Sequence, residues 1–240
     1  MPWSEAVKIP GQTSRAAPAL AAFPVDGAPA LHLVHLGEAS NDLWHAWTVD
    51  GHAWSADVKI PGQASRATPA LAVFGGALHL LHLGEESTAL WHSRSEDGRT
   101  WTRNARLPDR SSRAAPALAA FGGALHLVHL GEESADLYQS WSTDGHTWTK
   151  NARLPDRTSR ATPALAAVGG ELHLVHLGET STDLWHGRSV DGRTWSRNAR
   201  LPDQRSRAAP ALAAFGDALH LVHLGEASTD LWHSRLTLTP

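Results

Sequence analysis

The chain has 240 residues, and its 21 Lys plus Arg against 24 Asp plus Glu give a formal net charge of −3. This balance argues against a nucleic-acid binder, which normally presents a strongly basic face. The absence of cysteine excludes disulfides, thiolate metal sites and cysteine nucleophiles. Hydrophobic residues make up 42%, enough for a folded core, and the 11 Trp against a single Tyr indicate that one short sequence is repeated.

The N-terminal sequence MPWSEAVKIPGQTSR has no basic segment followed by an apolar stretch, so no secretory signal is visible. The longest weakly polar run, residues 114–131, is interrupted by Pro116, His126 and His129 and by a Gly-Gly pair. This run does not fit a membrane span. We expect a soluble chain with no membrane insertion, either cytoplasmic or released by a route that needs no signal peptide.

Five copies of one sequence follow each other along the chain. Four of the tryptophans recur at intervals of 47 residues: Trp54, Trp101, Trp148 and Trp195. The step from Trp3 to Trp54 is longer because PVDGAP, at 24–29, stands where the other copies have a tight turn. Periods of this length are typical of propellers, solenoids or arrays, so the content of one copy decides between them.

One copy, from Arg113 to Arg157, divides into four short segments. In chain order these are RAAPALAAF, ALHLVHLG, DLYQSWS and TWTKNARL. Each is bounded by Gly, Pro, Asp or Ser, as strands bounded by turns are, and none keeps an apolar 3.6-residue period over three turns. The Ala-rich first segment carries a proline at its fourth position and ends at Gly-Gly, which argues against a helix.

Four strands in each of five copies predict an all-β fold, a five-bladed β-propeller of antiparallel strands that spans residues 1–240 as a single domain. Small residues such as Ala19, Ala21 and Ala22 suit the strand nearest the crowded axis. The last copy, 207–236, ends after its third strand, whereas residues 3–9 match a fourth strand. We expect the N-terminal strand to complete the last blade and close the ring, which leaves no free sheet edge at the joint.

The turns between the third and fourth segments share one pattern. They read TVDGHAW at 48–54, SEDGRTW at 95–101, STDGHTW at 142–148 and SVDGRTW at 189–195. This pattern resembles the Asp-box, or BNR repeat, of the sialidase-like propellers, S-x-D-x-G-x-T-W, with one residue fewer between Asp and Gly. The physical roles agree with a structural turn, because Asp accepts backbone N–H bonds, Gly takes a positive φ and Trp packs between sheets.

The resemblance to Asp-box propellers implies that these turns lie on one face and that ligands bind on the opposite face. Two other loops of each copy would share the ligand face, and together they carry an arginine, a glutamate, usually an aspartate, and an aromatic ring. The candidate carbohydrate-binding residues are Arg15, Glu38, Asp42, Trp44, Arg66, Glu85, Trp91, Arg113, Glu132, Asp136, Tyr138, Arg160, Glu179, Asp183, Trp185, Arg207, Glu226, Asp230 and Trp232.

This mixture of side chains suits sugars, which need an aromatic face for their C–H groups and paired donors and acceptors for their hydroxyls. A second interpretation stays open for each arginine, namely that it pairs with Glu or Asp of a neighbouring blade and locks the ring. The copies also differ from one another. Ala89 replaces the aspartate in the second copy and Tyr138-Gln139 replaces Trp-His in the third, so we expect these two sites to be the weakest.

An enzyme of the sialidase kind is not expected. Those enzymes place three arginines, a Tyr–Glu nucleophile pair and an acidic Asp at one asymmetric central site. Here each copy supplies the same groups around the axis, and Tyr138 stands where the other copies have tryptophan. Catalysis requires different groups to converge on one reacting atom, so we predict that this chain has no catalytic residues.

Each copy carries two histidines in its second segment, for example His79 and His82. At this separation in a strand they point to opposite faces, so such a pair cannot chelate one metal ion. We expect structural histidines, some of which titrate near pH 6–7 and lower stability in acid. No metal and no cofactor is predicted.

The sequence therefore predicts a multivalent lectin with up to five shallow sites, each of them weak, on one rigid disc. Its partners would be glycans or glycoconjugates, and a monomer suffices for the fold, with an oligomer left open. The chief alternative is a protein-binding propeller that uses the same face, and a residual glycosidase is a third. Free monosaccharides at millimolar concentration would displace a lectin's ligand and leave a protein interface untouched.

Overall fold

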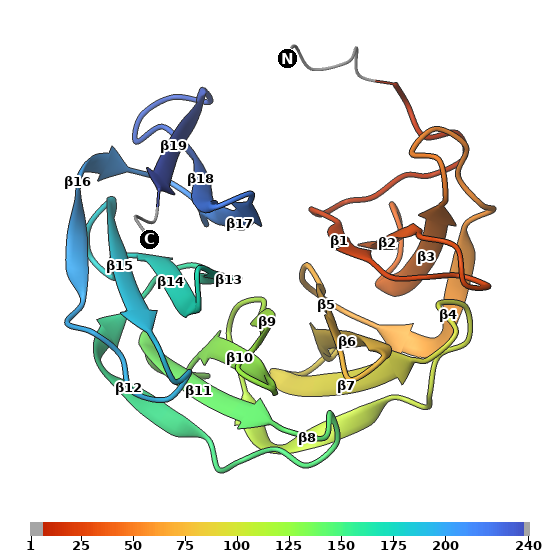
Figure 1. The fold of residues 1–240 in the computed structure, drawn as a ribbon, viewed down its shortest axis with the longest axis horizontal. Helices are drawn as coiled ribbons and strands as arrows, with labels where there is room; N and C mark the ends of the chain where they lie inside the picture. Colours follow the sequence, from red (N-terminus) through yellow and green to blue (C-terminus); the bar gives the residue numbers. More distant parts are fainter. Residues whose placement is uncertain (1–6, 238–240) are drawn as a thin grey trace.

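The computed structural model describes residues 7–237, which form 19 strands in five antiparallel sheets around a common axis (Figure 1). Consecutive strands are neighbours in every sheet, so each sheet is an up-and-down meander, here called a blade. The predicted all-β propeller of five blades is confirmed. Within the described residues, no helix is long and apolar enough to span a membrane.

The strands follow the repeat copy by copy. Blade 1 contains β1 (Ala19–Ala22), β2 (Leu31–Leu36), β3 (Asp42–Thr48) and β4 (Val58–Ala64). Blade 2 contains β5 (Ala70–Phe74), β6 (Ala77–Leu83), β7 (Ala89–Ser95) and β8 (Ala105–Ser111). Blade 3 contains β9 (Ala117–Phe121), β10 (Ala124–Leu130), β11 (Asp136–Ser142) and β12 (Ala152–Thr158). Blade 4 contains β13 (Ala164–Val168), β14 (Glu171–Leu177), β15 (Asp183–Ser189) and β16 (Ala199–Arg205). Blade 5 contains β17 (Ala211–Phe215), β18 (Ala218–Leu224) and β19 (Leu231–Thr237).

The innermost strands of the blades are the alanine-rich ones, as predicted. Figure 1 places β1, β5, β9, β13 and β17 nearest the centre, and each packs against the next in this order. Alanine side chains allow this close approach where strands converge. The Gly-Gly turn that follows β5 has positive φ at both Gly75 and Gly76, which a residue with a Cβ adopts only with strain.

The core lies between neighbouring blades rather than inside one of them. All seven residues of β10 are buried, because blades cover both of its faces. Leu130 and Leu137 of blade 3 belong to one apolar cluster with Leu172 and Leu174 of blade 4, and Trp195 packs against it. Strands that are covered on both faces carry nearly continuous apolar runs, which explains the repeated ALHLVHL sequence.

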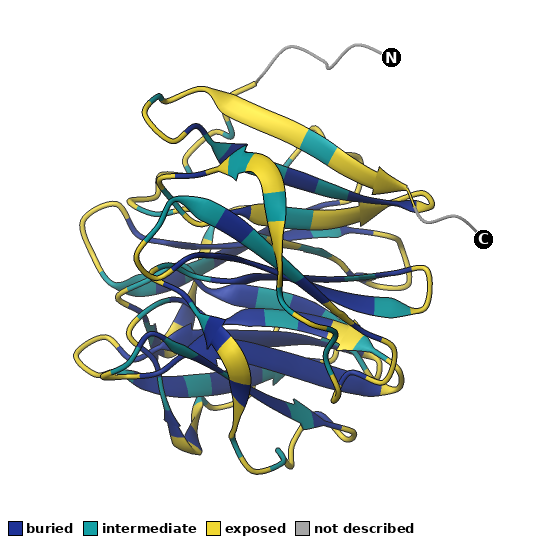
Figure 2. Ribbon diagram, turned by 90° about the vertical axis from the view of Figure 1, so that its left-hand side faces the viewer, coloured by how far each residue is buried: buried dark blue, intermediate teal, exposed yellow. Residues whose placement is uncertain are grey.

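The ring is open between the first and last blades in the described part of the chain. Blade 5 has three strands there, and its ribbon stands apart from that of blade 1 (Figure 1). Of the predicted closing strand at 3–9, residues 3–6 lie outside the described residues, and residues 7–9 belong to no strand. Closure by this segment stays a prediction. The strand β19, which leads to the C-terminal end in Figure 2, is exposed along almost all of its length.

Candidate functional site

The Asp-containing turns between the third and fourth strands are built as structural turns. In blade 3, Asp144 Oδ1 accepts hydrogen bonds from the backbone N–H groups of His146 and Thr147, each at 2.7 Å, and from Ser142 Oγ at 2.9 Å. The two backbone bonds are the main cause that holds the pKa of Asp144 well below its usual range. One oxygen of this carboxylate thus shapes its own turn.

The turns of blades 2, 3 and 4 also pack against the preceding blade. A Cβ built on Gly145 would lie 2.5 Å from Cε1 of His79, and the φ of Gly145 is +72°. Glycine is therefore required both for the backbone conformation and for the close approach. The turn connects one blade to the next and is not free to hold a ligand at this point.

The histidines of the second strand form hydrogen-bonded chains inside the blades. His32 Nε2 lies 3.0 Å from the carbonyl oxygen of Phe23, and its Nδ1 lies 2.9 Å from Nε2 of His45. Trp101 of the next blade donates to Nδ1 of His45 at 3.4 Å. One consistent set of neutral tautomers satisfies all three contacts, because each ring then donates once and accepts once. Burial is the main cause that lowers the pKa of His45 to about 3.

The contacts of these histidines are hydrogen bonds within the fold. Within residues 7–237, no group of three or more His, Asp or Glu side chains is arranged to hold a metal ion. In blade 3, Gln139 stands where the other blades have the second histidine of this hydrogen-bonded pair. It accepts from Trp195 Nε1 at 2.7 Å and donates to the carbonyl oxygen of Arg193 at 3.0 Å. An uncharged amide can therefore take the place of this histidine.

The two loops predicted to share the ligand face do lie together. The backbone N–H of Ser112, beside Arg113, donates to the carbonyl oxygen of Thr88 at 2.7 Å, and the other blades repeat this contact. The predicted arginines are all exposed: Arg15, Arg66, Arg113, Arg160 and Arg207. Arg113 donates to the carbonyl oxygen of Ser159 at 3.0 Å, and Arg15 contacts the Asn41 side chain. The structure places none of the five among the residues that line the cavities described below.

Three of the four predicted aspartates form ion pairs with basic residues on the fourth strand of their own blade. Asp136 lies 2.8 Å from Arg153, and Asp42 lies 2.8 Å from Lys59. Asp183 contacts both Arg200 and Arg205 at 3.3 Å. Asp230 of blade 5 is exposed. These carboxylates bind side chains of their own sheet.

Three of the five predicted glutamates contact the loop of the preceding blade. Glu85 accepts from Asn41 Nδ2 at 3.0 Å, and Glu132 accepts from the Thr88 hydroxyl. Glu226 accepts from the Thr182 hydroxyl and pairs with Arg205 at 3.3 Å. Glu38 of blade 1 is exposed. The glutamate thus belongs to the junction between two blades.

The predicted aromatic rings lie against the glycine that begins the Gly-Glu turn. A Cβ built on Gly84 would lie 3.0 Å from Trp91 Nε1, and one built on Gly131 would lie 3.2 Å from Tyr138 Cε2. Glycine at this position therefore lets the ring approach the turn. Trp44, Trp91, Tyr138 and Trp185 are half-buried, whereas Trp232 is 58% exposed. The rings keep part of their surface available to a ligand.

Cavities of one kind recur at three of the junctions between blades. Each is lined by the fourth strand of one blade and by the Gly-Glu turn and aromatic ring of the next. The volumes are about 510 Å³ between blades 1 and 2, about 780 Å³ between blades 3 and 4, and about 530 Å³ between blades 4 and 5. The predicted residues that line them are Glu85, Trp91, Glu179, Trp185, Glu226 and Trp232.

Sequence reasoning missed the residues that the preceding blade contributes. Asp156 and Arg157 of β12 line the cavity between blades 3 and 4, and Pro61 and Gly62 of β4 line the one between blades 1 and 2. The repeated Pro-Asp-Arg sequence at the end of the fourth strand was the available signal. Assigning one site to each copy concealed it, because every cavity takes residues from two copies.

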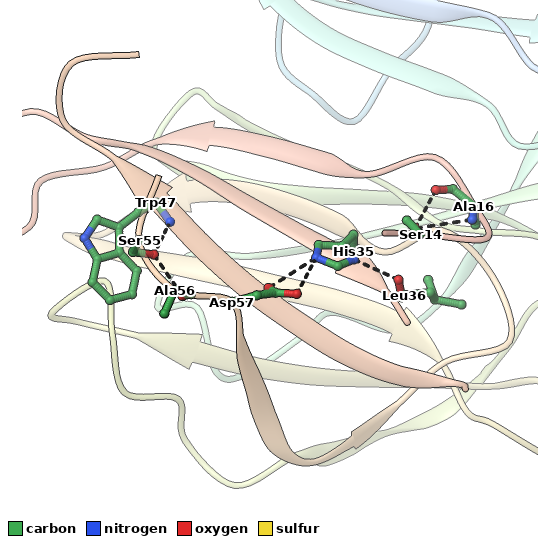
Figure 3. A network of polar contacts seen from close by, with 8 residues as sticks. All are labelled: Ser14, Ala16, His35, Leu36, Trp47, Ser55, Ala56 and Asp57. Carbon is green, nitrogen blue, oxygen red and sulfur yellow. Dashed lines mark hydrogen bonds and ion pairs between the residues drawn. The ribbon is translucent and has the colours of Figure 1, made fainter. Parts of the chain in front are cut away.

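The second histidine of the second strand lines two of the three cavities, as His176 and His223. His176 is buried, lines the cavity between blades 3 and 4, and has Nε2 at 3.2 Å from Asn198 Oδ1. Figure 3 shows the equivalent in blade 1, where His35 lies between the carbonyl oxygen of Leu36, at 2.8 Å, and Asp57, at 3.2 Å. Burial raises the pKa of the Asp57 carboxyl. Blade 1 alone has a carboxylate at this position, where the other copies have Asn104, Asn151 and Asn198.

No family model and no curated protein matches the chain. Among solved structures it is similar to the fungal lectin of Aleuria aurantia, described as a six-bladed β-propeller with a novel mode of fucose recognition. The two share 12% identity with a TM-score of 0.67, over 92% of this chain and 75% of that one. A variant of AofleA from Arthrobotrys oligospora gives 12% identity and a TM-score of 0.70, over 96% and 72%.

A glycosidase is similar to the same degree. The α-L-arabinanase of Penicillium chrysogenum, solved with arabinobiose, has 15% identity and a TM-score of 0.64, over 91% of this chain and 77% of that one. At these identities the similarity establishes the fold alone. The chain is a β-propeller of the architecture that both sugar-binding lectins and glycosidases use, and function has to be argued from the cavities.

Proposed function

We propose that this protein binds carbohydrates and has several sites of the same kind, one at each junction between adjacent blades. The observation that carries the proposal is the recurrence of one cavity at three junctions. Each combines a partly exposed tryptophan, a glutamate at its rim and polar groups of the neighbouring blade. Sugars need an aromatic face and a small number of placed polar groups, and these cavities offer both.

We infer binding rather than hydrolysis. A glycosidase needs a carboxylic acid with a raised pKa beside a second, free carboxylate. At the junctions, Glu85 and Glu132 accept hydrogen bonds from the preceding blade. The bond from Thr182 lowers the pKa of Glu226, which is opposite to what a general acid requires. The resemblance of the turns to the Asp-box supports the same family of architectures without adding a catalytic group.

The repetition of the cavity supports multivalent binding. Each site is shallow, so one monosaccharide would be held weakly, while a rigid arrangement of several sites raises the effective concentration on a dense glycan surface. A glycan polymer or a glycosylated surface is therefore the expected partner. A monomer already carries all the sites.

The test is binding of the labelled protein to a broad glycan array, with Trp185→Ala beside the wild type. We expect selective binding that free monosaccharides compete away, and a loss of about tenfold or more in the variant at the glycans that use this cavity. The matched control is Trp47→Arg, because the next copy has Arg94 at this position and Trp47 lines none of the three cavities.

The control variant should bind like the wild type. An array without binding by a folded protein, judged by its circular dichroism, would overturn the proposal and direct attention to protein partners. Turnover of an aryl glycoside that disappears on replacing a single carboxylate would replace binding by catalysis as the function.

A further inference from the structure

The three cavities are similar in shape but not in charge. Four arginines and two carboxylates line the cavity between blades 3 and 4: Arg153, Arg157, Arg193, Arg197, Asp156 and Glu179. The cavity between blades 1 and 2 has Arg103 against Glu85 and Glu86. The cavity between blades 4 and 5 has Arg205 against Asp203 and Glu226. One junction is therefore basic, whereas the two others carry more carboxylates than arginines.

The arginine at the centre of this difference is buried and lacks a carboxylate partner. Arg157 is 4% exposed, and its guanidinium donates to the backbone carbonyl oxygens of Pro155, at 3.1 Å, and Ser196. Within residues 7–237, no Asp or Glu lies at ion-pair distance from it, and its Nε has no hydrogen-bond partner. A buried cation without a counter-charge is costly, and an anion that enters the cavity would offset this cost.

The missing partner of Nε results from a glycine that only this copy has. In the preceding blade, Arg110 Nε donates to Ser140 Oγ at 3.1 Å. The residue that corresponds to Ser140 in blade 4 is Gly187, whose Cα faces the guanidinium of Arg157. Two further copies have a serine there, at Ser93 and Ser234, and the first copy has Ala46.

The glutamate of the same cavity has also lost its partner. Glu85, Glu132 and Glu226 each accept from an Asn or Thr of the preceding blade. The residue in that position for Glu179 is Ala135, which has no donor. Among the described residues Glu179 makes no hydrogen bond or ion pair, so its carboxylate is left to accept from a ligand hydroxyl.

Three departures from the repeat therefore affect residues that line one cavity. Ala135 replaces the donor for Glu179, Gly187 faces Arg157, and Gln139 lines the cavity itself and binds Trp195. Each of them removes or changes a hydrogen-bonding side chain that most of the other copies have. We propose that the junction between blades 3 and 4 binds an acidic glycan, with the sugar's carboxylate or sulfate facing the Arg157 side of the cavity and its hydroxyls donating to Glu179. This inference rests on the proposed function and assigns one site a ligand class that its siblings do not share.

The test is an array that presents galactose, galacturonate and galactose 6-sulfate, and the corresponding glucose series, within otherwise matched oligosaccharides. Arg157→Gln copies the residue that the chain itself has at Gln63 and Gln204, so the fold should tolerate it. We expect acidic glycans to lose at least about tenfold in affinity in this variant, because a charge-assisted hydrogen bond is worth about that factor or more. Neutral glycans should stay within about twofold.

A second variant tests the role of Glu179 without changing the charge of the cavity. Ala135→Thr restores the donor that Thr88 and Thr182 supply at the other junctions. Glu179 would then accept a hydrogen bond from the new hydroxyl, and the affinity for acidic glycans should fall about fivefold. The control is Arg110→Gln, which removes a buried arginine from the preceding blade and should leave the binding of acidic glycans within about twofold.

The outcomes separate the inference from the proposed function. If the affinity for acidic glycans is unchanged in Arg157→Gln, or if the protein binds only neutral glycans, the acidic site is overturned and the protein remains a carbohydrate-binding one. An equal loss in Arg110→Gln would overturn its location. The absence of binding to any glycan would overturn both. Comparing carboxylate with sulfate on the same ring then tells which anion the cavity prefers.

Discussion

Blade 3 and blade 5 have nearly the same sequence and very different surroundings. Leu137 at the start of β11 has no exposed surface, whereas its counterpart Leu231 in β19 is 73% exposed. Phe121 at the end of β9 is half-buried, and its counterpart Phe215 is 78% exposed. In the described residues blade 3 has neighbours on both sides and a fourth strand, while blade 5 has one neighbour and three strands.

The comparison shows that a propeller blade does not bury its own apolar residues. The leucines of one blade are covered by those of the next, as Leu130 and Leu137 are by Leu172 and Leu174. Identical residues thus contribute differently to stability according to their place in the ring. This difference also gives a direct way to ask whether residues 3–9 close the ring.

The largest effect is expected from matched leucine truncations. Leu137→Ala should lower the free energy of unfolding by about 3 kcal/mol, because it leaves a cavity in a fully covered site. Leu231→Ala should change it by less than about 0.5 kcal/mol, since the side chain is mostly exposed. Urea denaturation followed by tryptophan fluorescence measures both. Equal losses for the two variants would mean that blade 5 is covered in solution and that the N-terminal strand closes the ring.

A smaller difference is expected at the turns. A Cβ on Gly192 would lie 2.3 Å from Cε1 of His126 in the preceding blade, whereas a Cβ on Gly51 has nothing within 4 Å. Both residues have a positive φ. Gly51→Ala should therefore cost about 1 kcal/mol from the backbone alone, and Gly192→Ala about 2–3 kcal/mol because the contact adds to it.

Thermal unfolding of the two glycine variants gives this difference. If Gly51→Ala destabilises as much as Gly192→Ala, then a histidine of the last blade contacts Gly51 and the ring is closed. The leucine pair and the glycine pair probe opposite sides of the same joint, so agreement between them would be decisive.

The loss of stability at acidic pH (the acid limb of the curve of unfolding free energy against pH) should depend on the hydrogen-bonded histidines inside the blades. Burial is the main cause that lowers the pKa of His92 to about 3 and that of His79 to about 4. In the unfolded chain both titrate near 6.5, so the unfolded state binds protons first, and stability falls as pH drops from about 6.5 towards 3–4. The loss is up to about 1.4 kcal/mol per pH unit for each such histidine.

His92→Gln should flatten this acid limb while keeping the fold, because Gln139 fills the same position in blade 3 with its hydrogen bonds satisfied. The measurement is the free energy of unfolding at pH 7 and at pH 5 for the variant and the wild type. An unchanged difference between the two pH values would exclude the His79–His92 pair as a cause of acid sensitivity.

Much of the fold could be predicted from the sequence because the repeat supplies its own evidence. The interval between Trp54, Trp101, Trp148 and Trp195 fixed the number of copies, and the Gly-Gly and Asp-Gly turns divided each copy into strands. The structural role of the histidines was also predicted, although burial lowers their pKa values further than the expected pH 6–7. Turn and strand patterns are local, so one copy contains them in full.

The candidate site could be predicted only in part. Glu179 and Trp185 were identified from their own copy, whereas Arg157, which lines the same cavity, comes from the copy before. Arg160, which the period placed beside Glu179, is exposed and does not line it. The period of a repeat shows which residues are equivalent in different copies. It does not show which of them contact each other or line the same cavity.

The sequence by itself thus determined the repeat, the strands, the turns and the chemical types available at each junction. The tertiary structure decided which residues share a cavity, which carboxylates are occupied, and which leucines are covered. The physical reason is that the side chains of one blade are covered and bound by those of its neighbours. The lack of a side chain at Gly187, for example, matters because this residue faces Arg157 of the preceding blade. Such contacts join residues of different copies, and no pattern inside one copy encodes them.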